Sequence, residues 1–83
     1  MPTTLRSGPY RFSFWSQDCE EPRHTHVDRD RLSVKFWLDP DVRLAANHGF
    51  GRIELRRIER LVHEHVGELR YEWDRYCFDD GSS

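Results

Sequence analysis

The sequence predicts a small α+β domain, in which an antiparallel sheet of three to four strands packs against a long C-terminal helix. In the first half of the chain, apolar and polar residues alternate along short segments, which is typical of half-buried strands. In the second half, apolar residues recur at steps of three and four, which is typical of an amphipathic helix. With 83 residues, the chain is long enough for one small domain.

The expected strands follow one another along the first half of the chain. Residues 3–6 can form a short first strand, and residues 10–16 alternate strictly. An extended piece at 23–28 leads through a charged turn to a strand at 33–38, whereas 42–46 is ambiguous between a strand and a helical turn. The positions expected to face inward are Tyr10, Phe12, Phe14, Val34, Phe36 and Leu38.

A single helix is expected from about Arg52 to Cys77. Gly67 lies inside this segment and marks a candidate bend or break, because glycine disfavours a helix interior. One domain is expected over residues 1–78, followed by a disordered tail at 79–83. The apolar stripe of the helix comprises Leu55, Ile58, Leu61, Val62, His65, Val66, Leu69, Trp73 and Tyr76.

Composition and charge limit the functions and the cellular location that we expect for this protein. The net charge of −2 gives no general electrostatic reason to expect nucleic acid binding. Because there is no long apolar run and no secretion leader, we expect a soluble cytoplasmic protein that does not contact membranes. We expect Cys19 and Cys77 to be free thiols, since two cysteines are too few for a disulfide framework. No cofactor is expected, and self-association would help so short a chain to bury apolar surface.

The outer face of the sheet holds the first candidate site. In a strand, His24 and His26 share one face and Val27 takes the other, so both histidines face outward if Val27 faces the core. Cations interleaved with aromatic side chains suit stacking on bases and pairing with phosphates. The alternative is that the tryptophans pack together and the histidines merely cover a solvated surface. The expected outward side chains are Arg11, Trp15, His24, His26, Lys35 and Trp37.

Two histidines beside a lysine also form the smallest set of catalytic groups that a metal-independent ribonuclease needs. One neutral imidazole can accept the proton of the RNA 2′-hydroxyl group, and a second, protonated imidazole can donate to the leaving oxygen. The catalytic candidates are therefore His24, His26 and Lys35. The two histidines could instead chelate a metal together with Cys19 or Asp28, but their spacing matches no standard structural zinc pattern, so no metal is expected.

The helix provides a second candidate site. At 100° per residue, one outward stripe contains Arg52, Arg56, Arg60, His63 and Arg70. Like charges four residues apart, and cations near a helix N-terminus, are unfavourable, which suggests an anionic partner. The alternative is an ordinary solvated face, since Glu64 follows Arg60 at the i+4 position.

Several short motifs resemble those of a bacterial family of small domains of unknown function. The residues that carry the resemblance are Leu5-Arg6, Gly8 to Phe12, Pro22, His24 to Val27, Lys35 to Leu38, Asn47 to Phe50, Leu55, Ile58, Leu61-Val62, His65, Trp73 and Tyr76. The resemblance covers nearly the whole chain.

The resemblance implies one half of a compact two-gene module in a toxin–antitoxin-like arrangement. It therefore implies a protein partner encoded nearby and a regulatory or RNA-directed role. The function expected first is a small interaction module, and enzyme activity is expected only as an alternative. The alternatives are the ribonuclease and a nucleic-acid-binding protein that uses its helix arginines.

Overall fold

The computed structural model describes residues 3–14 and 19–78. It contains one antiparallel sheet of five strands, which follow one another in sequence order, and two helices. The strands are β1 (Thr3–Ser7), β2 (Tyr10–Ser13), β3 (His24–Arg29), β4 (Leu32–Trp37) and β5 (Arg43–His48); the helices are α1 (Arg52–Glu64) and α2 (Val66–Phe78). The α+β class is confirmed, but the expected number of three to four strands is wrong.

The fifth strand comes from the segment whose sequence was ambiguous. β5 pairs with β4, and the register shifts between Lys35 and Phe36, so that Lys35 lies opposite Ala46 and Phe36 opposite Leu44. Since β5 has an irregular register and no fully buried position, its sequence lacks the alternation of a strand with one buried face.

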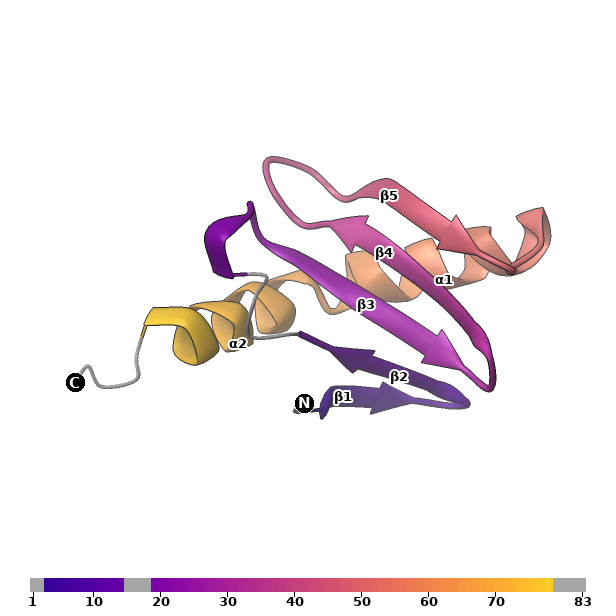
Figure 1. Cartoon of the computed structure of the whole chain (residues 1–83), viewed down its shortest axis with the longest axis horizontal. Helices are drawn as coiled ribbons and strands as arrows, with labels where there is room; N and C mark the ends of the chain where they lie inside the picture. Colours follow the sequence, from indigo (N-terminus) through magenta and orange to yellow (C-terminus); the bar gives the residue numbers. More distant parts are fainter. Residues whose placement is uncertain (1–2, 15–18, 79–83) are drawn as a thin grey trace.

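Both helices lie on the same side of the sheet and follow one another along its length (Figure 1). The inward positions expected from the strand alternation are buried, including Phe12, Val34 and Leu38, each with no exposed surface. The helices contribute four fully buried residues at steps of four, seven and four, namely Ile58, Val62, Leu69 and Trp73. The apolar residues of the alternating strands and those of the helical stripe therefore pack together in one hydrophobic core.

The expected single helix is divided at His65. The backbone of this residue leaves the helical region (φ −112°, ψ 14°), and its N–H group contacts the carbonyl oxygens of both Leu61 and Val62. α2 starts at the next residue, and Gly67 is its second residue rather than the point of the break. The single helix expected from Arg52 to Cys77 is therefore two helices, and the break for which Gly67 was the candidate lies two residues earlier, at His65. Neither helix of the described chain is long and apolar enough to cross a membrane.

Two contacts fix α2 to the start of β3 and to the loop after β4. Arg23 donates two hydrogen bonds to the Asp74 carboxylate, over distances of 2.8 and 3.0 Å. Arg70 donates to the carbonyl oxygen of Leu38 and lies 3.4 Å from Asp39. The expectation that Arg70 belongs to a solvent-facing stripe is therefore wrong, because its guanidinium group is held by the Leu38 carbonyl oxygen and by Asp39.

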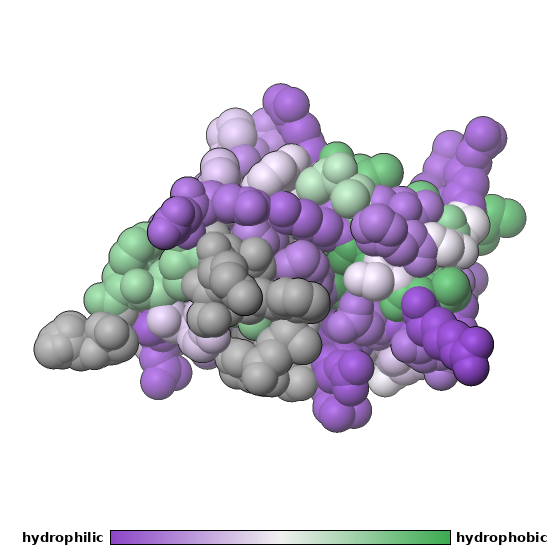
Figure 2. Space-filling view, in the orientation of Figure 1, coloured by the Kyte–Doolittle hydropathy of each residue, from purple (hydrophilic) through white to green (hydrophobic). Residues whose placement is uncertain are grey.

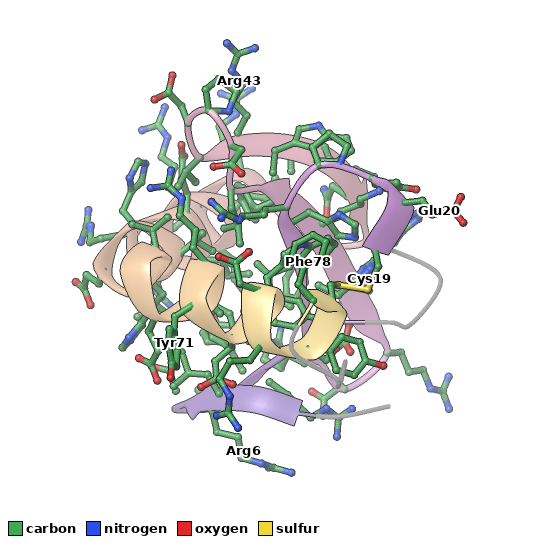
Figure 3. All side chains as sticks on the ribbon, turned by 90° about the vertical axis from the view of Figure 1, so that its left-hand side faces the viewer. Arg6, Cys19, Glu20, Arg43, Tyr71 and Phe78 are labelled. Atoms are coloured by element: carbon green, nitrogen blue, oxygen red, sulfur yellow. A yellow bond between two sulfur atoms is a disulfide. The ribbon has the colours of Figure 1, made fainter. Side chains whose placement is uncertain are left out.

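A disulfide bond joins Cys19 to Cys77, so the expectation of free thiols is also wrong. It connects the segment before β3 to the last turn of α2 (Figure 3). The two cysteines are 58 positions apart, and only the tertiary structure brings them together.

Candidate functional site

The outer face of the sheet brings two of the candidate side chains together. His26 and Lys35 are direct partners across β3 and β4. The Lys35 ammonium group donates to the Glu21 carboxylate over 2.8 Å and lies 4.5 Å from the ring centre of Trp37. Lys35 is therefore partly covered and already has a counter-ion, although the surface on this side of the molecule is largely hydrophilic (Figure 2).

His24 lies inside the molecule, with no exposed surface. Its ring packs 4.9 Å from that of Trp73 in α2, and 5.2 and 5.5 Å from those of His26 and Trp37. The pairing of β2 with β3 ends at Ser13 and His26, so His24 lies beyond the end of β2, where its ring can reach α2. The prediction that both histidines face solvent is therefore wrong for His24.

The environment of His24 also determines which ring nitrogen carries hydrogen. Nδ1 lies 3.0 Å from the carbonyl oxygen of Pro22, and a carbonyl can only accept, so Nδ1 is the donor. A general acid or base must reach the substrate, and this imidazole is fully covered by protein. The roles of His24, His26 and Lys35 in catalysis stay predictions.

Of the other outer-face candidates, Arg11 is exposed on β2, opposite Arg6 and Asp28 of the neighbouring strands. Trp15 lies outside the described residues. The sulfur of Cys19 is bonded to Cys77 and cannot act as a thiolate ligand in this state, which removes Cys19 from the alternative metal site with His24 and His26.

The second candidate site, on α1, is more open. Arg52, Arg56 and Arg60 are all exposed, as the sequence predicted. A shallow hollow of about 280 Å³ on the helix surface is lined by Ile53, Arg56, Arg57 and Arg60. The Ile53 side chain is 76% exposed, which is the largest value among the exposed large apolar residues of the described chain.

The sequence analysis missed Ile53 and Arg57 as members of this site. The four lining residues are spaced i, i+3, i+4 and i+7, which is the spacing of a single helix face. An isoleucine outside the apolar stripe and in register with three arginines is a signal that could have identified this face. We call these four residues the α1 basic face.

Among the described residues, none forms an ion pair or hydrogen bond with the side chains of Arg52, Arg56 or Arg60. In particular, the expected contact between Arg60 and Glu64 is absent from the described part of the chain. Arg57 differs, since it interacts electrostatically with Tyr10 and Glu54. Most of the positive charge on the α1 basic face is therefore available to an external anion.

A cluster of three residues fixes the start of α1 to the sheet. Arg29 of β3 donates to both carboxylate oxygens of Glu54, over 2.7 and 2.9 Å, and the Tyr10 hydroxyl group donates over 2.7 Å. These hydrogen bonds, with that from Arg29 first, hold the pKa of Glu54 below its ordinary value. Burial, followed by the contact with Glu54, raises the pKa of Tyr10. The sequence analysis did not single out this cluster, because its members come from three separate elements.

A family model matches residues 10–74, which span the sheet from β2 onwards, α1 and most of α2. No curated protein and no solved structure shows a significant match to the chain. The expected resemblance to a family of small uncharacterised domains is confirmed. Since the match covers most of the chain, the protein belongs to the family described as Domain of unknown function (DUF4160).

Proposed function

We propose that this protein is a small interaction module that binds an acidic surface of a partner protein through the α1 basic face. The observation that carries the proposal is the exposure of Ile53 among arginines, two of which, Arg56 and Arg60, have no ion-pair partner in the described chain. An apolar anchor surrounded by arginines is the composition of an energetic hot spot in protein interfaces. In Figure 2, an apolar patch stands among hydrophilic side chains at the end of the molecule where α1 begins.

The positions of the positive charges near the start of α1 favour a role in binding rather than in stabilising the fold. Arg52 and Arg56 are four residues apart near the helix N-terminus, where like charges repel each other and cations oppose the helix dipole. Each effect costs a few tenths of a kcal/mol, about as much as an exposed ion pair returns. A partner carboxylate would reverse both effects, and Ile53 would gain burial at the same time. The gene-pair arrangement implied by the family resemblance points to a partner encoded nearby.

The geometry of the outer sheet face supports the interaction module over the ribonuclease. A ribonuclease of the expected type needs two imidazoles that reach one phosphodiester. His24 has no exposed surface, and the Lys35 ammonium group is occupied by Glu21. By contrast, the α1 basic face needs no rearrangement before it can meet a ligand.

The test is capture of the partner from the cells of origin, followed by binding measurements with the purified pair. Charge reversal at Arg56→Glu and Arg60→Glu should abolish capture, and Ile53→Ala should weaken binding at least about tenfold. All three side chains are exposed, so the free energy of unfolding should change by no more than about 0.5 kcal/mol per substitution.

A matched control is available in Arg31→Glu with Arg43→Glu, which changes the net charge equally at exposed positions outside α1. Retention of the same partner by both double variants would exclude the α1 basic face as the binding surface. Recovery of RNA in place of protein, lost with Arg56→Glu and Arg60→Glu, would support the nucleic-acid-binding alternative.

A further inference from the structure

The segment 19–23 lies against the outer-face site and is fixed at both ends. Cys19 is bonded to Cys77 at the end of α2, and Arg23 is held by Asp74 of the same helix. Between these anchors, Glu21 contacts the Lys35 ammonium group over 2.8 Å. One disulfide bond therefore lies two residues along the chain from the carboxylate that contacts Lys35.

We propose that the Cys19–Cys77 disulfide is a redox-controlled latch: reduction releases Glu21 and uncovers Lys35 on the outer face of the sheet. The inference concerns the side of the sheet away from the helices and does not depend on the binding role of α1. It gives a function to a disulfide bond that the sequence composition did not predict.

Three arguments favour release of Glu21 once the disulfide is broken. Glu21 is exposed and its side chain is 45% accessible, so its ion pair with Lys35 is of the weak, solvent-screened kind. Breaking the bond removes the covalent anchor of the segment at Cys19, whereas Pro22 and Arg23 keep their contacts with His24 and Asp74. The freed Glu21 then gains chain entropy that opposes re-formation of the pair.

The reductant required is a dithiol. One of its thiolates attacks a sulfur of the Cys19–Cys77 bond and forms a mixed disulfide, while the other cysteine leaves as a thiolate. The second thiol of the reductant then displaces the remaining cysteine and closes its own disulfide. The dithiol loses two electrons and two protons, and Cys19 and Cys77 become thiols. Both cysteines are only partly buried, so the bond can be approached from solvent.

Lys35 provides a direct readout, because it is the only lysine in the sequence. Lys35 and the terminal amine are therefore the only amines of this sequence that an acylating reagent can modify, and mass spectrometry of the peptides measures the two rates separately. The oxidised protein should acylate slowly at Lys35, whose side chain is 22% exposed. Dithiothreitol should increase this rate severalfold relative to the rate at the terminal amine. The Cys19→Ser/Cys77→Ser variant should react fast with or without dithiothreitol.

A second variant separates the latch from general loosening of the fold. Glu21→Gln keeps the disulfide bond but removes the carboxylate, so its oxidised form should already acylate severalfold faster than the oxidised wild type. Circular dichroism of the reduced protein shows whether the sheet and helices persist. The proposal is overturned if the folded, reduced protein acylates at the oxidised rate or if Glu21→Gln has no effect. It is also overturned if reduction unfolds the domain, since the bond would then be a structural staple.

Discussion

Thr25 lies on the buried side of β3, and its hydroxyl group has no hydrogen-bond partner within the residues that the structure describes. A buried hydroxyl group without a partner costs about 1–3 kcal/mol relative to a satisfied one. Thr25→Val keeps the β-branched shape and removes the polar atom, so it should leave the free energy of unfolding unchanged or raise it by about 1 kcal/mol.

Urea denaturation of the two proteins measures this difference, with Thr25→Ala as a control that also removes a methyl group and should be destabilising. A loss of more than about 1 kcal/mol in Thr25→Val would mean that the hydroxyl group has a partner in solution.

Protonation of Glu54 should lower the free energy of unfolding of the domain at acid pH. Its pKa is held below the ordinary value of 4.5, mainly by Arg29. The folded state therefore binds fewer protons at this site than the unfolded state, so Glu54 stabilises the fold above the ordinary pKa. This contribution is lost as the pH falls through the lower, folded-state pKa. Between neutral pH and values below 4.5, the wild type should lose more unfolding free energy than Glu54→Gln.

Chemical denaturation across that pH range checks this expectation, because the other carboxylates titrate in both proteins and cancel in the comparison. Glu64→Gln, at an exposed position of the same helix, is the control and should follow the wild type. Identical acid sensitivity of Glu54→Gln and wild type would contradict the role of the Arg29 contact.

At the scale of elements, replacing a glycine by alanine should raise the free energy of unfolding at one position and lower it at another. Gly67 is the second residue of α2, and an added Cβ atom would meet nothing within 4 Å. Gly67→Ala should therefore raise the free energy of unfolding by about 0.5–1 kcal/mol, because alanine favours the helix.

Gly49, in the connection between β5 and α1, has φ +111°, and an added Cβ atom would lie 2.5 Å from Cδ2 of Leu32. Gly49→Ala should cost about 1–3 kcal/mol, since an L-residue is strained in this backbone region. Thermal melts of the two variants side by side would check the opposite signs. Equal effects would mean that the backbone at one of the two sites differs from the structure.

At the scale of the whole molecule, the disulfide bond contributes a large share of stability. The cysteines enclose a loop that spans 58 positions, and closing such a loop in the unfolded chain is worth about 4 kcal/mol. Small domains have total stabilities of only about 5–15 kcal/mol. Reduction should therefore lower the denaturant midpoint strongly while leaving a folded domain in water. Denaturation with and without dithiothreitol tests this, and an unchanged midpoint would show that the bond does not constrain the unfolded chain.

Local patterns in the sequence were sufficient for much of the fold. The alternation around Phe12 and Phe36 identified the buried face of the strands, and the spacing from Ile58 to Trp73 identified the buried face of the helices. These features depend on a residue's immediate neighbours in the chain, since strand and helix periodicities are properties of the local backbone. The exposed arginines of α1 were predictable for the same reason.

The tertiary structure decided the features that depend on distant partners. His24 is buried because it lies beyond the end of β2 and reaches Trp73 of α2. Arg70 turns to the loop after β4, and Cys19 meets Cys77 at the end of the chain. Each contact joins elements that are far apart in sequence, and no periodicity within one element can specify it. The sequence by itself therefore determined which faces are buried, whereas the packing of α2 on the sheet decided which candidate side chains stay accessible.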